Sequence, residues 1–446
     1  MKQPSNETRR DFLKTTSKIT AAGVAAGLVV PSNLSLAKSA NVGGTDTVRI
    51  GLVGCGGRGT QAAKQAMKTK GNVELVAVGD VFENRLNQSL EGCQESHPKK
   101  TKVEDKNKFV GFDAYKRVLD SAIDMVLLVT PPGFRPMHFE AAVDAGKHVF
   151  MEKPVAVDAP GIRRVLKASA KAKEKNLAVA VGLQRRHERA YEETMEQLKE
   201  GIIGDILVSR VYWNGTTPWV YNRREGQTEL EYQMRNWYFF NWICGDHIVE
   251  QHIHNLDVIN WLNDGFPVKA QGQGGRLVRD GKNHGQIYDH HMVEFTYANG
   301  HRMISQCRHM PDCHNQVGEF VHGTKGYANV GRGKIYSPDG EVIFHSKGKR
   351  GGHQQEHHDL FASMRDGIIP NEGEYGAKST MTAILGRLAT YTGRELKWED
   401  AINSNISLAN VEQLASMDAE PPLKPDENGK YWVPKPGADV SKTIDF

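Results

Sequence analysis

The sequence has no hydrophobic run long enough to cross a bilayer, because its N-terminal apolar stretch, residues 19–30, is shorter than the ~20 residues that a membrane-spanning helix needs. With five cysteines in 446 residues and no CxxC spacing, it is not a small disulfide scaffold. The chain also has little net charge, with 57 Lys and Arg against 53 Asp and Glu. Because the sequence has no basic stripe, a nucleic-acid partner is not expected. The remaining composition is ordinary for a globular protein, and the length predicts two or three domains.

The first 37 residues have the order of a twin-arginine export signal. Arg9 and Arg10 precede Phe12, the apolar stretch follows, and Ser35–Ala37 suits signal peptidase. Cleavage after Ala37 would remove five basic and two acidic side chains and lower the net charge from +4 to +1. We therefore expect a signal peptide at 1–37, a linker at 38–46 and a periplasmic or otherwise exported protein, folded around its cofactor before export.

A glycine-rich turn follows the first apolar strand, residues 48–53. Its glycines fit G-x-G-x-x-G, in which the first glycine allows the turn, the second admits a pyrophosphate and the third packs helix against strand. The motif predicts a nucleotide-binding turn made of Gly54, Gly56, Gly57, Arg58 and Gly59.

The context of this turn predicts a dinucleotide-binding domain at residues 47–183. A second apolar run ends at Asp80, about 20 residues beyond the glycines, where a carboxylate can bind both ribose hydroxyls. The same carboxylate would repel a 2'-phosphate, which favours NAD over NADP. Strands expected at 124–129 and 147–151, with a helix at 136–145 between them, predict a Rossmann doubly wound parallel sheet.

Two strand ends carry candidate cofactor-binding residues. Thr130 and Pro131 close one strand, and Glu152 and Lys153 close the next. A solvated Glu-Lys pair is the ordinary interpretation of Glu152 and Lys153. At the carboxyl end of a parallel sheet, however, a lysine can stabilise a developing alkoxide or take part in proton transfer.

These residues resemble the glucose-fructose oxidoreductase and inositol dehydrogenase family, Gfo/Idh/MocA. The resemblance covers nearly all of the chain after the signal and is most specific in the run from Ala145 to Pro154. It implies an NAD(P)-dependent oxidoreductase in which Lys153 lies beside the nicotinamide and the substrate hydroxyl. It also implies that the Lys153-Pro154 bond is cis.

The second half, residues 184–446, is predicted to be an α+β domain with a large, mainly antiparallel open sheet. Strands are expected at 205–213, 269–278, 292–297 and 302–307, and helices at 248–262, 355–365 and 377–390. By resemblance, this domain holds substrate and forms a homo-oligomer, a dimer or tetramer, through its sheet.

Glu250 and His254 are four residues apart and would share one face of the expected helix. The carboxylate could orient the imidazole, and the imidazole could remove a hydroxyl proton. A solvated pair or a buried structural histidine fits the same spacing. The resemblance favours His254 as the acid–base residue, although related enzymes carry Asp where this chain has Glu250.

Histidines are concentrated in the second half, where 14 of 18 lie between His247 and His358. Two groups could offer metal ligands: His247, His252 and His254, or His353, His357 and His358. No metal-binding spacing completes either group, so no metal site is predicted.

A cluster of aromatic residues between Trp213 and Trp242 predicts either core packing or a platform for a sugar ring. The candidate substrate-binding residues are Arg186, Trp213, Arg235, Trp237 and His254.

The sequence therefore predicts an exported NAD-dependent oxidoreductase that acts on a sugar or glycoside hydroxyl with a tightly held nucleotide. Two alternatives remain open. One is an NAD-dependent glycoside hydrolase that transiently oxidises the sugar ring, and the other is a non-enzymatic sugar-binding protein with structural NAD.

Overall fold

The computed structural model describes residues 47–279 and 282–445. The signal peptide and linker expected at 1–46 lie outside these residues.

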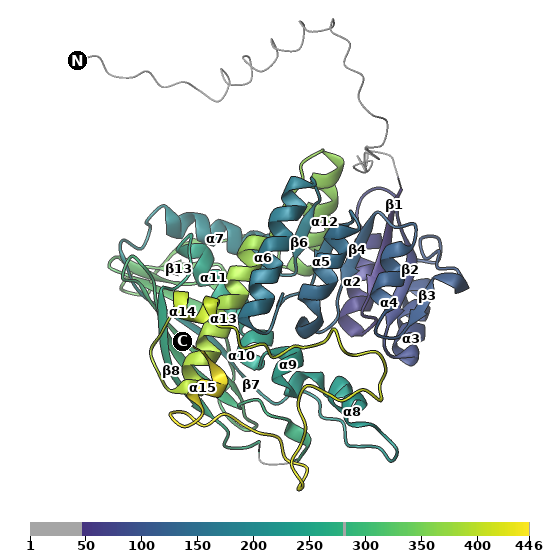
Figure 1. Cartoon of the computed structure of the whole chain (residues 1–446). Helices are drawn as coiled ribbons and strands as arrows, with labels where there is room; N and C mark the ends of the chain where they lie inside the picture. The colour runs from purple at the N-terminus through teal and green to yellow at the C-terminus, as the bar shows by residue number, and fades with distance from the viewer. Residues whose placement is uncertain (1–46, 280–281, 446) are drawn as a thin grey trace, which may run out of the picture. The chain divides into compact units, whose positions relative to one another are not determined.

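The first domain is built on six parallel strands in the order β3-β2-β1-β4-β5-β6 (Figure 1). The strands are β1 (Val48–Val53), β2 (Val73–Asp80), β3 (Lys108–Val110), β4 (Met125–Leu128), β5 (His148–Met151) and β6 (Val179–Val181). The strand order reverses between β1 and β4, which makes the crevice where sheets of this kind bind ligands. The predicted doubly wound parallel sheet is confirmed.

Helices cover both faces of this sheet. They are α2 (Gly57–Met67), α3 (Glu83–Ser96), α4 (Ala114–Asp120), α5 (Arg135–Asp144) and α6 (Ala159–Glu174). In β4, Val126 and Leu128 belong to the core with α4, α5 and α6, whereas Met125 and Leu127 belong to the core with α2 and α3. The apolar run of this strand is therefore explained by burial on both faces.

The second domain contains a nine-stranded sheet in the order β14-β13-β12-β11-β7-β10-β9-β8-β15. The strands are β7 (Ile206–Gly215), β8 (Lys269–Gly275), β9 (His290–Thr296), β10 (Arg302–His309), β11 (Gln316–Gly323), β12 (Gly326–Asn329), β13 (Lys334–Tyr336), β14 (Val342–His345) and β15 (Leu396–Lys397). Every pair is antiparallel except β7 with β10, so the sheet is mixed. The expected mainly antiparallel sheet is confirmed.

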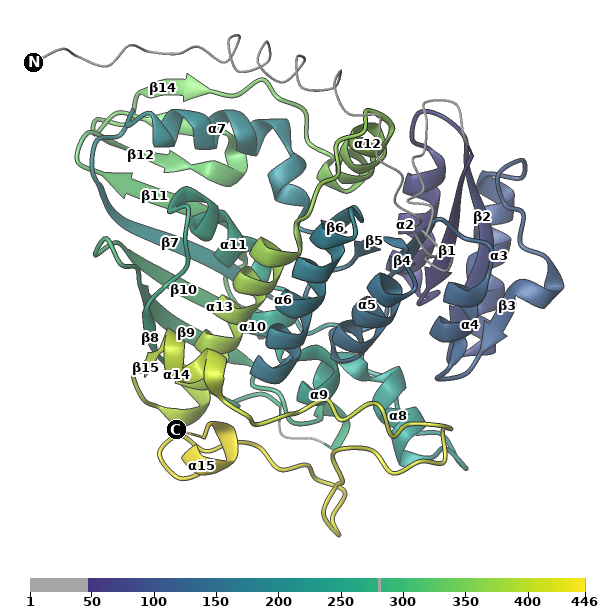
Figure 2. The same cartoon turned by 45° about the horizontal axis from the view of Figure 1, so that its top comes forward.

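The helices of the second domain pack mainly on one face of this sheet (Figure 2). They are α7 (Arg189–Lys199), α8 (Glu229–Arg235), α9 (Asn241–Cys244), α10 (His247–Glu250), α11 (Ile253–Leu262), α12 (Gly352–Arg365), α13 (Gly373–Thr392), α14 (Trp398–Asn403) and α15 (Val440–Thr443). Of these helices, α12 packs on α2, where Leu360, Phe361 and Met364 join the core of the first domain, and α13 and α14 pack on α6.

The single helix expected at 248–262 is broken into α10 and α11. At the break, the backbone N–H of His252 donates to the carbonyl of His247, five residues back, instead of the usual four. Asp246, just before α10, has a φ of +74°. The break changes the relative direction of side chains before and after it, which matters for Glu250 and His254.

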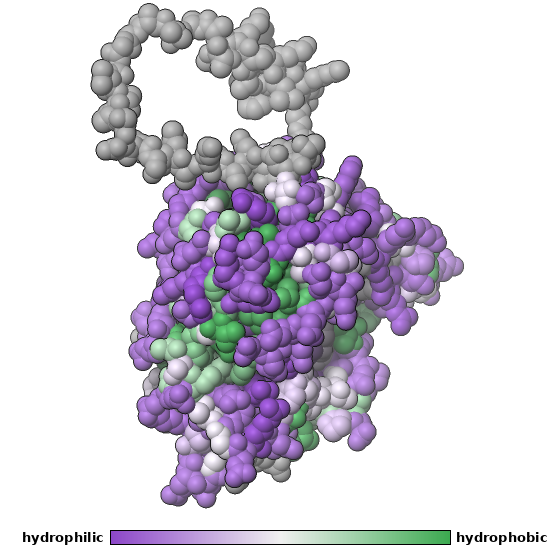
Figure 3. Space-filling view, turned by 90° about the vertical axis from the view of Figure 1, so that its right-hand side faces the viewer, coloured by the Kyte–Doolittle hydropathy of each residue, from purple (hydrophilic) through white to green (hydrophobic). Residues whose placement is uncertain are grey.

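The five cysteines are free, including the buried Cys307 and the exposed Cys313, which are the two nearest in the sequence. Over residues 47–279 and 282–445, no helix is both long and apolar enough to span a membrane. The face seen in Figure 3 is mainly hydrophilic, with apolar residues gathered toward its middle.

Candidate active site

A cleft of about 660 Å³ lies at the crevice between β1 and β4 and is closed on its other side by the second domain. All of the predicted cofactor and catalytic residues line it: Gly54, Gly56, Gly57, Arg58, Gly59, Asp80, Thr130, Pro131, Glu152, Lys153, Glu250 and His254. The fold therefore brings Gly54 and His254, which are 200 positions apart in the chain, to one cavity.

The glycine turn leaves room for a phosphate where the motif requires it. A side chain at Gly54, whose φ is +97°, would lie 2.6 Å from the backbone of Thr130, and one at Gly59 would lie 1.8 Å from the carbonyl oxygen of Gly54. Gly56 has no protein atom within 4 Å of the position of a Cβ. It also precedes α2, whose N-terminus has no side-chain cap, so backbone N–H groups are available for a pyrophosphate.

Asp80 is held rigidly at the end of β2. Its two carboxylate oxygens accept hydrogen bonds from the backbone N–H groups of Cys55 (2.6 Å) and Phe82 (2.8 Å). Burial raises its pKa above the usual value, although these bonds oppose the change. Asp80 thus connects the glycine turn to the edge of the cleft where a ribose would lie.

Lys153 meets Glu250 across the cleft. Its Nζ donates to the backbone oxygen of Glu250 (2.5 Å) and to Oε1 of the same residue (3.1 Å). Burial raises the pKa of Glu250 to about 7, even though the neighbouring ammonium of Lys153 lowers it. The peptide bond between Lys153 and Pro154 is cis, as the resemblance implies.

His254 is buried and stacks on Trp213, with ring centroids 6.0 Å apart. Burial, followed by the charge of Lys153, lowers its pKa well below the usual value. The imidazole is therefore neutral near pH 7 and can accept a proton. The expected support of His254 by Glu250 is not what the structure has, because His254 Nδ1 and Glu250 Oε2 both lack a hydrogen-bond partner and Glu250 binds Lys153.

The substrate candidates divide into two groups. Arg235 and Trp237 line the cleft together with Trp219 and Tyr221. Arg186 does not line it, because its guanidinium forms two hydrogen bonds with Asp257 (2.9 and 2.8 Å). Trp213 also lies outside the lining and supports His254 from behind.

A cluster of charges completed by α12 adds Glu356 and His353 to the site; the sequence predicted neither as an active-site residue and offered His353 only as a possible metal ligand. Arg58 donates to Glu152 (2.5 Å) and to Glu356 (2.9 Å), and His353 also lines the cleft. Burial, followed by the charge of Glu152, raises the pKa of Glu356 well above its usual value. Glu356 and His353 reach the glycine turn because α12 docks on α2. No spacing in the sequence predicts that contact.

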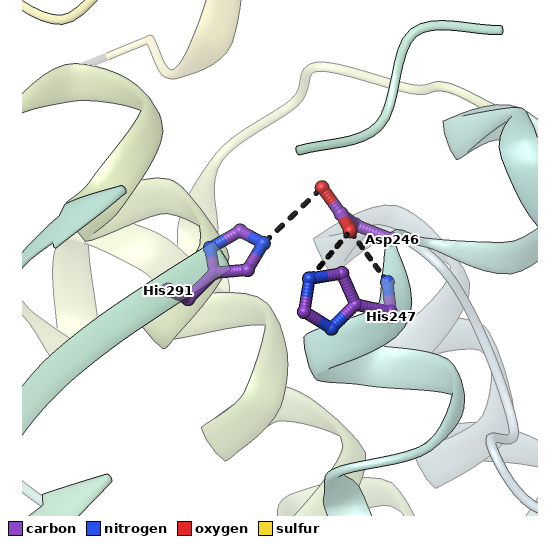
Figure 4. Close-up of side chains that lie close together, drawn as sticks. All are labelled: Asp246, His247 and His291. Carbon is purple, nitrogen blue, oxygen red and sulfur yellow. Dashed lines mark hydrogen bonds and ion pairs between the residues drawn. The ribbon is translucent and has the colours of Figure 1, made fainter. Parts of the chain in front are cut away.

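A second polar cluster lies in the interior of the second domain (Figure 4). Asp246, His247 and His291 are buried and offer three possible ligand atoms within 4.8 Å of one another. This donor set can hold a divalent ion. It differs from both histidine groups considered from the sequence, and its carboxylate already accepts hydrogen bonds from Tyr288 N (2.9 Å) and Tyr391 Oη (2.5 Å).

Two family models match the chain. Residues 48–183 match the GFO_IDH_MocA model, described as an oxidoreductase family with an NAD-binding Rossmann fold, and residues 191–329 match the GFO/IDH/MocA C-terminal domain. Inositol 2-dehydrogenase of Cereibacter sphaeroides is 28% identical over 275 residues, 61% of this chain and 71% of that protein. Inositol 2-dehydrogenase of Paracoccus denitrificans is 26% identical over 225 residues, 50% of this chain and 57% of that protein.

Solved structures share the fold. Scyllo-inositol dehydrogenase from Lactobacillus casei, with bound NAD(H) and scyllo-inositol, has a TM-score of 0.61 at 20% identity and covers 79% of this chain and 100% of that one. Levoglucosan dehydrogenase, in complex with NADH and levoglucosan, has a TM-score of 0.61 at 16% identity and covers 79% of this chain and 99% of that one.

Proposed function

Because the chain belongs to the Gfo/Idh/MocA family of NAD-binding oxidoreductases, we propose that it oxidises a hydroxyl-bearing carbon of a sugar or glycoside, with NAD as the oxidant. One observation carries the proposal: the cleft contains both the nucleotide-binding turn and the Lys153, Glu250 and His254 side chains. NAD, when bound, supplies a hydride acceptor. The open space at Gly56 and the anchored carboxylate of Asp80 fit its pyrophosphate and ribose.

The protein side of the reaction divides between two residues. His254, neutral because it is buried, takes the proton of the substrate hydroxyl. Lys153 stabilises the oxygen on which negative charge develops, and Glu250 holds the Lys153 ammonium in place through two oxygens.

The aromatic wall of the cleft supports a carbohydrate substrate. Trp219 and Trp237 lie with ring centroids 5.9 Å apart, and Trp219 is 43% exposed. The C–H face of a pyranose packs well on an indole ring of this kind.

Export and nucleotide retention form the finer part of the proposal. The twin-arginine pattern at 1–37 supports translocation of a folded, cofactor-loaded chain. An exported enzyme meets no replenished pool of NAD, so its nucleotide must stay bound and be reoxidised in place. Fractionation of cells that express the full chain tests the export, which recovery only in the cytoplasmic fraction would contradict.

The reaction is tested with a panel of glycosides, by following absorbance of the bound nucleotide at 340 nm and by mass spectrometry of the products. A keto-sugar is the expected product. We expect His254→Ala to abolish reduction of the nucleotide while NAD stays bound, and the exposed His345→Ala to behave as the native chain. Undiminished reduction in His254→Ala would refute the assignment.

The same assay separates the two alternative functions. A released leaving group without net change of the nucleotide would instead indicate redox-assisted hydrolysis. Sugar binding without any absorbance change would indicate a binding protein with structural NAD.

A further inference from the structure

The segment from Trp219 to Trp237, which contains α8, reaches from the second domain to the nucleotide-binding edge of the first. The guanidinium of Arg235 lies over the ring of Phe82, 5.1 Å from its centroid. Phe82 is two residues beyond Asp80, on the edge of the cleft where the adenosine ribose of a dinucleotide lies. The contact therefore crosses the cleft at its adenosine end.

The Arg235 side chain is fixed in this position. Its Nε donates to Glu231 Oε1 (3.0 Å), one turn earlier on α8, and only 18% of the side chain is exposed. Phe82 and Phe112 of the first domain pack on the same apolar cluster as Leu230 and Met234. Apolar packing between the two domains therefore adds to the cation–π contact of Arg235 with Phe82.

Residues near the start of this segment also contact residues near its end. Asn236 accepts a hydrogen bond from the backbone N–H of Tyr221 (2.8 Å) and donates one to the Tyr221 carbonyl (3.0 Å). Trp219 packs on Trp237 and Tyr238. These contacts make residues 219–237 one unit rather than a free loop.

The C-terminal segment braces this unit from the other side. Thr228 and Gln233 donate to the carbonyls of Met417 and Leu423, each at 2.6 Å. Figures 1 and 2 both show the yellow C-terminal segment running beside α8. The same segment is fixed to the first domain, because Asp158 at the start of α6 accepts from the backbone N–H of Leu408 (2.7 Å).

We propose that α8, braced by the rest of residues 219–237, is a clasp that closes the adenosine end of the nucleotide site and slows the release of NAD. This inference rests on the proposed function and assigns Arg235 to retention of the nucleotide rather than to recognition of the sugar. A nucleotide leaving the site must break the Arg235–Phe82 contact or pass around it. The braced position of α8 makes that opening costly.

Release is measured by loading the full chain with NADH and chasing it with excess NAD, while energy transfer from protein tryptophan to bound NADH is followed. We expect Arg235→Ala to speed release on the order of tenfold, the size of a partly desolvated cation–π contact. Arg235→Lys keeps the charge and loses the planar stack, so its release rate is expected to lie between that of the native chain and that of Arg235→Ala. Arg189→Ala is the matched control, because Arg189 is an exposed arginine outside the cleft that also pairs with a glutamate one turn away on its own helix.

The outcomes separate the clasp from the proposed function. Release from Arg235→Ala within a factor of two of the native rate, in a variant with unchanged melting temperature, would overturn the clasp alone. A native chain that binds no NADH would overturn the proposed function and the clasp with it. A second variant, Phe82→Ala, removes the other partner and is expected to match Arg235→Ala in release rate.

Discussion

At the scale of single residues, the partner of Glu250 changes the expected chemistry. Sequence spacing predicts a Glu250–His254 pair. In the structure, Glu250 instead pairs with Lys153, and the ring of His254 stacks on Trp213. The residue types in the site were predictable because their chemistry is local. Their pairing was not, because it depends on the break between α10 and α11 and on the approach of a lysine 97 positions away.

The titration of Glu250 should control the pH dependence of turnover. Its pKa is raised to about 7, so the carboxyl group is protonated below that pH and pairs with Lys153 above it. We expect nucleotide reduction to rise with pH through about 7 in the native chain. In Glu250→Gln this inflection should be lost and the rate reduced.

Rates of reduction of bound nucleotide between about pH 5.5 and 9 check this prediction. Glu341→Gln serves as the control, since Glu341 is exposed and outside the cleft. An inflection near pH 7 that persists in Glu250→Gln would assign the titration to another group.

At the scale of elements, the turn between β1 and α2 contains two glycines of one motif, Gly56 and Gly59, that have different roles. A Cβ at Gly59 would lie 1.8 Å from a backbone oxygen, whereas a Cβ at Gly56 would meet no protein atom within 4 Å. We expect Gly59→Ala to destabilise the fold by about 1–3 kcal/mol, as overpacking does. Gly56→Ala should preserve stability and weaken NADH binding on the order of tenfold.

Thermal unfolding of both variants without nucleotide, together with NADH titration, distinguishes the two effects. Gly215→Ala is the control, because a Cβ at Gly215 would also meet no protein atom within 4 Å. Gly201→Ala is unsuitable, since the φ of Gly201 is +83°. A loss of stability in Gly56→Ala equal to that in Gly59→Ala would contradict the separation.

The elements themselves were largely predictable where a pattern is continuous. The apolar runs of β1, β2, β4 and β5 mark buried parallel strands, and the strands expected at 292–297 and 302–307 appear as the antiparallel pair β9 and β10. The docking of α12 on α2 was not predictable, because its apolar side chains look the same whichever domain they face. The same holds for the C-terminal segment, because two of its hydrogen bonds with the α8 region are accepted by backbone carbonyls, which carry no sequence signature.

At the scale of the whole molecule, the helices within residues 47–279 and 282–445 pack mainly on one face of the nine-stranded sheet and leave the other face open. Met292 on β9 is 47% exposed and lies beside Gln306 of β10, and Phe320 on β11 packs edge-on against Tyr212 of β7. Apolar side chains spread over neighbouring strands of an open sheet are typical of an interface between subunits. They support the expectation that the chain assembles as a homo-oligomer through this sheet.

A charge placed on this face should separate the subunits without reaching the cleft. We expect Ile304→Glu, at the centre of β10, to convert a dimer or tetramer into monomers, because burying a new carboxylate in an interface costs free energy that the neighbouring Arg210 offsets only in part. Light scattering coupled to gel filtration measures the change. Ile368→Glu is the matched control, since Ile368 is 62% exposed and lies outside the sheet. A native chain that is already monomeric, or an Ile304→Glu variant that keeps the native mass, would show that the subunits do not meet through this face.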